Sequence, residues 1–287
     1  MAIYVVGSIN ADLTTVVPHR PTGGETVLAS ELRRSPGGKG ANQAVAAARA
    51  GGRVTMIGAV GADDLGRAQL AALDAAGVRT GPVAVLDDAP TGLAFIVLTP
   101  DGENSIVVVP GANRRLDGAL SALRDNLREG DVVVAQAEIG PAAVDAAATA
   151  AATRGARLVV SDAPVVPLAP ATLAAADPLI VNEHEAHDLL GGPLPEGSTL
   201  AAAVLRATGA RSVVVTLGGA GCVVVTGDTV ETVVPGEPAD VVDTTGAGDV
   251  FVGTLAAAVA AGADLLAAAL AGNRAAARSV GVAGARG

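Results

Sequence analysis

The segment Asp243-Thr-Thr-Gly-Ala-Gly-Asp249 holds residue types that suit phosphoryl transfer to a hydroxyl group. Its two glycines let the backbone turn tightly and approach a ligand closely. The apolar, Ala-rich residues that follow predict a helix, whose first N–H groups would face an anion. Asp249 would stand in the first turn, where its carboxylate can take a proton. An anion site beside a base is what this transfer requires; a glycine-rich turn with Asp249 as a helix cap is the alternative.

A second glycine-rich turn, Pro36-Gly-Gly-Lys-Gly-Ala-Asn-Gln43, also enters a predicted helix. Its Gly-Lys pair resembles a Walker A motif, but Gly40 occupies the position where that motif needs Ser or Thr, so this phosphate loop is absent. Lys39 and Asn42 remain as side-chain donors beside backbone amides that a ligand can approach. The combination suits a polyhydroxyl ligand, and a plain strand-to-helix turn is the alternative.

Carboxylates also follow several of the predicted strands. Asp12 comes after the first strand, and its two oxygens could accept hydrogen bonds from adjacent sugar hydroxyls. Glu138 follows the strand at 131–135. Asn182 and Glu185 stand at the start of a predicted helix, where their oxygens suit Mg²⁺, which takes few protein ligands and keeps several waters. On spacing alone, turn residues and an acid-rich helix start are the simpler interpretations.

The segment Thr216-Leu-Gly-Gly-Ala-Gly221 resembles a dinucleotide fingerprint only weakly, because its glycine spacing differs from Gly-x-Gly-x-x-Gly. It stands between two predicted strands and not before a helix, which favours a hairpin turn. Its backbone could still contact a nucleotide.

Composition limits the partners. With 19 basic and 29 acidic residues the net charge is −10, which argues against nucleic acid and against an anionic membrane surface. An anionic ligand would therefore need helix ends, backbone amides or a metal ion. The N-terminus reads as a strand and not as a signal peptide, and the apolar region 255–272 is interrupted by Asp264 and glycines, unlike a membrane span. We therefore expect a cytoplasmic protein.

Short β-branched runs alternate with Ala-rich stretches along most of the chain, which predicts an α/β fold. We expect a three-layer sandwich in which a mostly parallel central sheet has helices on both faces, as one domain over residues 1–287. Strands are expected at 2–7, 53–60, 131–135, 157–161, 178–181 and 212–217. Helices are expected at 40–51, 64–76, 115–129, 141–153, 183–190, 198–209, 247–261 and 264–281.

Two segments, 12–35 and 90–110, break this alternation because they are β-like and lack a helix. In the second, the runs 93–99 and 105–109 flank Pro-Asp-Gly-Glu-Asn, which predicts a hairpin. Together the two segments are expected to form a small sheet, or lid, over the carboxyl edge of the main sheet, where α/β proteins bind ligands.

Six segments, in this order, resemble the ribokinase-like (pfkB-type) carbohydrate kinase family. They are Gly-Ser-Ile-Asn-Ala-Asp (7–12), Gly-Gly-Lys-Gly-Ala-Asn-Gln-Ala (37–44), Gly-Ala-Asp-Asp-Leu-Gly (61–66), Val-Pro-Gly-Ala-Asn (109–113), Asn-Glu-His-Glu (182–185) and Asp-Thr-Thr-Gly-Ala-Gly-Asp (243–249). The likeness covers nearly the whole chain. It implies an ATP-dependent sugar kinase, and segments 7–12 and 37–44 favour phosphorylation of D-ribose at its O5 hydroxyl.

The resemblance also implies roles for particular residues. Asp249 would be the general base, and the amides of Gly246, Ala247 and Gly248 would form the anion hole. The sugar would be held by Asn10, Asp12, Gly38, Lys39, Gly40, Asn42, Glu138 and Asp249. The nucleotide would be bordered by Asn182, Thr216, Leu217, Gly218, Gly219, Ala220, Gly221, Gly248 and Asn273. Glu185, together with Asn182, would position Mg²⁺ through water. A monovalent cation, K⁺ in this family, would lie near Asp243, Thr245, Ser279, Val282 and Gly284.

The sequence departs from the family pattern at two places. It ends at Gly287, before the segment that usually adds a last serine ligand and a closing stretch, which leaves potassium activation open and is consistent with a shortened chain. The family's Asn-Pro-Ala-Pro segment is Ser161-Asp-Ala-Pro164 here, which we interpret as a tolerated loop change. Lids of this family often pair, so the resemblance further implies a homodimer.

Two alternatives stay open. A kinase of the same fold could act on a nucleoside, on deoxyribose or on a keto-sugar acid, although a nucleoside base would want an aromatic pocket and aromatics make up only 1% of the chain. A sugar-binding regulator without catalysis is the other, against which the intact Asp249 and Gly246-Ala-Gly248 argue.

Overall fold

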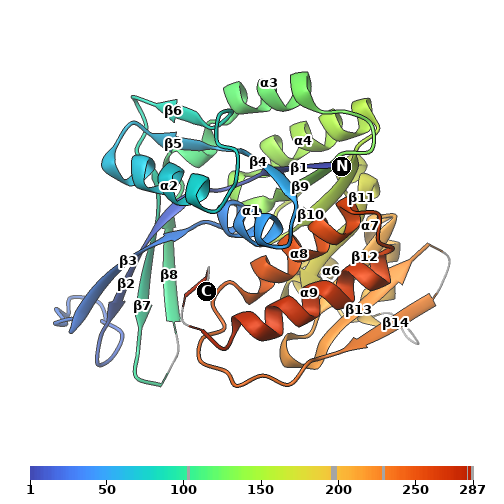
Figure 1. Ribbon diagram of the computed structural model, residues 1–287. Helices are drawn as coiled ribbons and strands as arrows, with labels where there is room; N and C mark the ends of the chain where they lie inside the picture. The colour runs from blue at the N-terminus through green and yellow to red at the C-terminus, as the bar shows by residue number, and fades with distance from the viewer. Residues whose placement is uncertain (102–103, 195–198, 228–229, 283, 286–287) are drawn as a thin grey trace.

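The computed structural model describes residues 1–101, 104–194, 199–227, 230–282 and 284–285. Its main sheet has eight strands and helices on both faces (Figure 1). In spatial order the strands are β14 (Val230–Pro235), β13 (Gly221–Thr226), β12 (Ser212–Thr216), β11 (Ala176–Asn182), β10 (Arg157–Ser161), β9 (Val132–Gln136), β1 (Ala2–Val6) and β4 (Arg53–Ile57). The strands from β4 to β12 run parallel, and β13 and β14 are added antiparallel.

Both faces of the sheet are covered, which explains the continuous apolar runs of its strands. Val132 and Val134 of β9 belong to a core with one set of helices, and Val133 and Ala135 belong to a second core on the opposite face. The first set is α1 (Lys39–Arg49), α2 (Asp64–Ala75), α8 (Ala247–Ala260) and α9 (Leu265–Ser279). The second set is α3 (Asp117–Asn126), α4 (Pro141–Arg154), α6 (Glu183–Leu190) and α7 (Leu200–Thr208).

A second sheet of four strands projects from the main body (Figure 1). Its order is β3 (Glu31–Gly37), β2 (Asn10–Val16), β7 (Gly92–Leu98) and β8 (Asn104–Val109). Asn10, the first residue of β2, pairs with Gly37, the last of β3, so both strands are rooted where β1 ends and α1 begins. This sheet is the expected lid, and β7 and β8 form the expected antiparallel hairpin. The assignment of the whole chain to a single domain stays a prediction.

The predicted α/β architecture is confirmed, with local differences. The run 53–60 is divided into β4 and β5 (Ala59–Gly61), and β5 pairs with β6 (Ala84–Leu86) in a separate two-stranded sheet. No helix or strand was predicted at β6, β14 or α5 (Pro170–Ala175). β6 has only three residues, too few for a hydrophobic period to stand out. In the part of the chain that the structure describes, no helix has the length and apolarity needed to cross a membrane.

Candidate active site

The carboxylate of Asp249 lies in the first turn of α8 and is held by two side chains of α1. Its Oδ2 accepts a hydrogen bond from Asn42 Nδ2 at 3.0 Å, and its Oδ1 accepts one from Gln43 Nε2, also at 3.0 Å. Only 9% of Asp249 is exposed. An amide that donates to each oxygen fixes the plane of the carboxylate, as a base needs if it is to meet a hydroxyl in one geometry.

The glycine turn before α8 has the backbone shape that the sequence predicts. Gly246 adopts a left-handed φ of 77°, and a Cβ there would lie 2.6 Å from the Ala285 carbonyl oxygen, so a larger residue is excluded. A Cβ at Gly248 would meet no heavy atom within 4 Å, which shows open space in front of the helix end. The resemblance implied that the Ala247 amide takes part in the anion hole. In the structure this amide already donates to the Thr244 carbonyl at 3.2 Å. In this structure, Gly246 and Gly248 are the turn residues that line the cleft.

A cleft of about 150 Å³ lies in front of Asp249. It gathers side chains and glycines from the carboxyl ends of three strands and from the starts of α1, α6 and α8. Its predicted site residues are Lys39, Asn182, Glu185, Thr216, Gly246, Gly248 and Asp249. Burial of the Lys39 ammonium opposes its charge, but the carboxylates of Asp249, Glu138 and Glu185 outweigh this and raise the pKa of Lys39 above its usual value. A positively charged ammonium is therefore favoured in the cleft that Asp249 also lines.

The polar residues at the root of the lid form a second, connected group. The Ser8 hydroxyl donates to Glu138 Oε2, and the Lys39 amide lies 3.4 Å from the same oxygen. Asn10 is 3% exposed, and its Oδ1 accepts a hydrogen bond from Asn113 Nδ2 at 2.7 Å. Asn113 also accepts from the Ile9 amide at 2.9 Å, so it fixes the first residues of the lid. Asn113 lies in the family segment 109–113, but the sequence alone did not indicate a role for its side chain.

Asn182 and Glu185 form a capping box at the start of α6. Asn182 Oδ1 accepts from the Glu185 amide at 2.8 Å, and Glu185 Oε2 accepts from the Asn182 amide at 2.8 Å. The helix-cap interpretation is therefore correct for the local structure. A helix cap is compatible with the predicted role in positioning Mg²⁺. Both residues also line the cleft and keep oxygen lone pairs that can accept from a metal-bound water.

The departure at Ser161-Asp-Ala-Pro164 puts an extra carboxyl group beside the cleft. Asp162 is 1% exposed and its Oδ1 accepts a hydrogen bond from the Val166 amide at 3.3 Å. Burial raises the pKa of Asp162 to about 6, and the negative charge of Glu185 adds to the rise. The neighbouring Ser161 and Ala163 line the cleft. The sequence pattern indicated a loop change here but not a buried acid.

The predicted nucleotide segment is a hairpin turn between β12 and β13, as its position between two predicted strands indicated. A short turn of 3₁₀ helix covers Gly218–Ala220, and the Leu217 amide donates to the Gly221 carbonyl at 2.8 Å. Gly218, Gly219 and Ala220 are exposed. Asn273 of α9 donates to the Pro235 carbonyl at 2.6 Å and is 8% exposed, so it braces the end of β14 behind this hairpin.

The residues expected around a monovalent cation lie in two adjoining loops. Asp243 Oδ1 accepts from the Thr245 amide and Oδ2 from the Gly284 amide, each at 2.9 Å. The amides of Val242 and Asp243 both donate to the Val280 carbonyl, at 2.7 and 3.0 Å. The Val282 amide donates to the Ser279 carbonyl at 3.2 Å. Val280, which the sequence did not single out, thus joins the loop before α8 to the end of α9.

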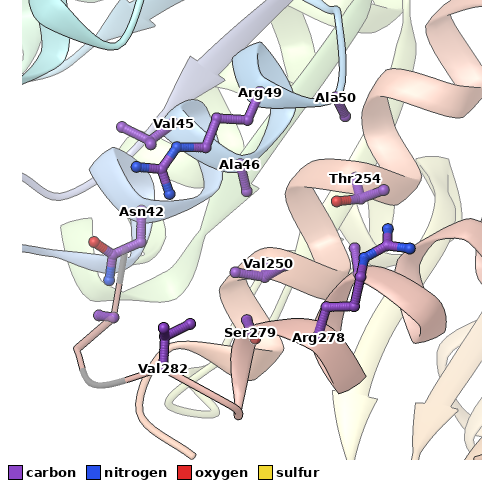
Figure 2. A pocket seen from close by; sticks show the side chains of 12 residues that line it. Asn42, Val45, Ala46, Arg49, Ala50, Val250, Thr254, Arg278, Ser279 and Val282 are labelled. Atoms are coloured by element: carbon purple, nitrogen blue, oxygen red, sulfur yellow. The ribbon is translucent and has the colours of Figure 1, made fainter. Parts of the chain in front are cut away.

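A separate cavity of about 310 Å³ lies between α1, α8, α9 and the loop after α9 (Figure 2). Val45, Val250 and Val282 give it largely apolar walls, and Arg49 and Arg278 lie at its sides. Neither Asp249 nor Lys39 is among the residues that line it. The smaller cleft, which both residues line, is therefore the candidate active site.

Comparison with known sequences identifies ribokinases among the relatives of this chain. The model of the pfkB family carbohydrate kinases matches residues 2–287. A ribokinase of Bacillus subtilis is 44% identical over 186 residues, 64% of this chain and 63% of its own. A ribokinase of Haemophilus influenzae is 34% identical over 75% of this chain and 71% of its own. The alignment with the Bacillus protein thus spans a little less than two thirds of that relative's length.

Solved structures agree over the entire fold. A ribokinase of Thermotoga maritima has a TM-score of 0.87 at 32% identity, covering 100% of this chain and 95% of its own. A ribokinase of Arabidopsis thaliana, solved with ribose and ATP, has a TM-score of 0.89 at 32% identity with the same coverage. A nucleoside kinase of Burkholderia thailandensis shares the fold at 23% identity and a TM-score of 0.79. Because the family model matches residues 2–287, the chain belongs to the pfkB family of carbohydrate kinases.

Proposed function

We propose that this carbohydrate kinase transfers the γ-phosphoryl group of ATP to the O5 hydroxyl of D-ribose, giving D-ribose 5-phosphate and ADP. The observation that carries the proposal is the Asp249 carboxylate, fixed by Asn42 and Gln43 beside the glycine turn at the start of α8. Ribokinases from Bacillus and Haemophilus at 44% and 34% identity support the choice of ribose. The Arabidopsis structure with ribose and ATP supports both ligands.

In the proposed reaction Asp249 removes the O5 proton while O5 attacks the γ-phosphorus, and the bond between that phosphorus and the oxygen of the leaving ADP breaks in line. Negative charge on the transferring group is met by the amides at the start of α8 and by the ammonium of Lys39. The three carboxylates that raise the pKa of Lys39 keep this ammonium charged. Catalysis is then mostly positioning and electrostatic stabilisation.

On the sugar side, the root of the lid supplies acceptors and donors suited to hydroxyl groups. Asn10 and Glu138 are already oriented by Asn113 and Ser8, respectively. Asp12 follows on β2, on the same face of that strand as Asn10 because side chains alternate. Preorientation of this kind lowers the entropy lost when a small ligand binds.

Mg²⁺ fits the oxygen groups at the start of α6. Asn182 and Glu185 would hold it through water, and when bound it would neutralise charge on the ATP phosphates. Both residues line the cleft that contains Asp249. We also propose a K⁺ site formed by carbonyl oxygens of the loops near Asp243 and Val282, because Asp243 ties the loop before the anion hole to Gly284.

A homodimer through the lid is a further part of the proposal. The lid exposes Leu32, Phe95, Ile106 and Val107, which is unusual for large apolar side chains on a small sheet. Phe95 and Val107 are direct cross-strand partners and lie on one face. A cytoplasmic location fits a reaction that consumes ATP.

The test is an ADP-release assay with ATP and Mg²⁺ against pentoses, deoxyribose, hexoses, nucleosides and keto-sugar acids, with Na⁺ or K⁺ as the only monovalent cation. We expect the highest kcat/KM with D-ribose, and ³¹P NMR of the product should show a phosphate ester on O5. A higher kcat/KM with a nucleoside or a keto-sugar acid would overturn the ribose assignment. Absence of ribose-dependent ADP release, with ribose still bound in calorimetry, would favour a regulator.

A further inference from the structure

Three buried amide and carboxylate groups form a chain behind the catalytic cleft. Gln43 Nε2 donates to Asp249 Oδ1 at 3.0 Å, and Gln136 Nε2 donates to Gln43 Oε1 at 2.7 Å. Gln43 is 1% exposed and Gln136 is 0% exposed. Gln43 lies on α1, Gln136 ends β9, and Asp249 lies on α8, so three separate elements meet in this chain.

Chemistry fixes which group donates and which accepts in each hydrogen bond of this series. An ionised carboxylate only accepts hydrogen bonds, so Gln43 must turn its NH₂ group toward Asp249 and its oxygen toward Gln136. Gln136 can then satisfy that oxygen only with its own NH₂ group. The amide of Gln136 thereby determines which end of the Gln43 amide faces the base.

The last group of this hydrogen-bonded chain, the Gln136 amide, lowers the stability of the folded protein. Gln136 Oε1 is buried and has no hydrogen-bond partner among the described residues. It lies over Gly7, where a Cβ would approach this oxygen to 1.7 Å, so the close contact depends on a glycine at that position. A buried acceptor without a partner lowers stability. An apolar side chain at 136 would avoid that loss, which points to a function for the amide.

We propose that Gln43 and Gln136 are positioning residues for the general base: Gln136 orients the Gln43 amide, and Gln43 holds the Asp249 carboxylate in the plane from which it takes the sugar proton. Gln136 is followed in the chain by Ala137 and then Glu138, whose carboxylate belongs to the lid root. The same short segment thus sets the position of the base and of a sugar-binding carboxylate. This inference rests on the kinase function proposed above.

The test compares Gln43→Met, Gln136→Met and the double variant, with Gln69→Met as control. Met is close to Gln in size and lacks the donor. Gln69 is a matched control because it is also buried, at 3% exposed, and like Gln136 has a buried Oε1 without a partner among the described residues, but it lies on α2. We expect kcat to fall about tenfold or more in Gln43→Met and in Gln136→Met, with the ribose KM changed about twofold or less. Gln69→Met should keep the wild-type kcat.

Two further readouts separate positioning from general damage. Since Gln136 acts through Gln43, the double variant should lose no more activity than Gln43→Met alone. The acidic limb of kcat/KM against pH should move up by about one pH unit in Gln43→Met, because the lost donor stabilised the charged base. Should Gln136→Met not fold, the isosteric Gln43→Glu, which places a second carboxyl beside Asp249, should shift this limb further upward.

Additive losses, an unshifted acidic limb, or an equal fall of kcat in Gln69→Met would overturn the positioning role. All variants are assayed with the acceptor that the wild type phosphorylates best. A preferred acceptor other than ribose would therefore refute the ribose assignment alone, whereas wild-type kcat in Gln43→Met would refute the positioning role with the kinase function intact.

Discussion

Asn42 Nδ2 lies 3.0 Å from Asp249 Oδ2, although the two residues stand 207 positions apart in the chain. The contact exists because α1 and α8 pack very closely. A Cβ at Gly253 of α8 would lie only 2.3 Å from the Gln43 carbonyl oxygen and 2.7 Å from the Ala46 Cβ. The absence of a side chain at 253 therefore lets the amides of α1 reach the carboxylate of α8, and the geometry of the base depends on helix packing.

Gly253→Ala should separate α8 from α1 and lengthen both hydrogen bonds to Asp249. We expect a loss of about 1–3 kcal/mol in the free energy of unfolding, typical of an overpacked core, together with a lower kcat. Gly118→Ala is the matched control, because Gly118 is also helical but a Cβ there would meet nothing within 4 Å. That variant should gain roughly 0.5–1 kcal/mol. Urea unfolding and the ADP-release assay measure both effects; equal behaviour of the two variants would contradict this account.

Asp249→Asn should lower kcat by at least about 10²-fold, the low end for the loss of a general base. The amide is close in size, but its single oxygen can accept from only one of the two donors, Asn42 or Gln43, so the fold should persist with a modest loss of stability. Ribose should still bind in calorimetry. Near-normal turnover in this variant would remove Asp249 from the mechanism.

Gly37→Ala should weaken sugar binding more than catalysis. Gly37 ends β3, and a Cβ there would lie 2.1 Å from both carboxylate oxygens of Asp12, so the carboxylate would have to move. Since a hydrogen bond to a charged group contributes about 1.5–3 kcal/mol, we expect the ribose KM to rise about tenfold or more. The ATP KM should stay constant. Gly23→Ala, where a Cβ meets nothing within 4 Å, is the control and should keep both KM values.

Asp162→Asn should change how stability depends on pH. The folded pKa of Asp162 is about 6, above the ordinary value of 3.8 for an aspartate, so the folded protein holds a proton that the unfolded chain releases between these values. Stability of the wild type therefore falls as pH rises through about 4 to 6, by roughly 2–3 kcal/mol from this group. The amide keeps the acceptor for the Val166 amide and carries no charge.

The measurement for Asp162 is urea unfolding at pH 5 and at pH 8. Asp162→Asn should be more stable than the wild type at pH 8, and the difference should shrink at pH 5. Asp125→Asn, an exposed carboxylate on α3, should follow the wild type at both values. A constant difference across this range would show that burial of Asp162 does not govern the effect.

Features that depend on neighbouring residues along the chain were predictable before the structure. The glycine turn before Asp249 predicts a helix start, and α8 begins at Ala247. The apolar runs of β9 and β10 predict strands covered on both faces, and both cores contain their side chains. Asn182 and Glu185 predict a helix cap, which they form. These outcomes follow from local hydrogen bonding and from hydrophobic period, which a few consecutive residues set.

The contacts between groups that are distant in the chain depend on how the helices and strands pack. Gln43 and Asp249 are 206 positions apart, and Gln136 and Gln43 are 93 apart, so no spacing in the sequence could join them. Asn113 reaches Asn10 across 103 positions, and Asp162 becomes a buried acid because of what packs around it. Burial and distant partners change the energy of a charge or an amide far more than its neighbours in sequence do, and they exist only once the helices and strands have packed.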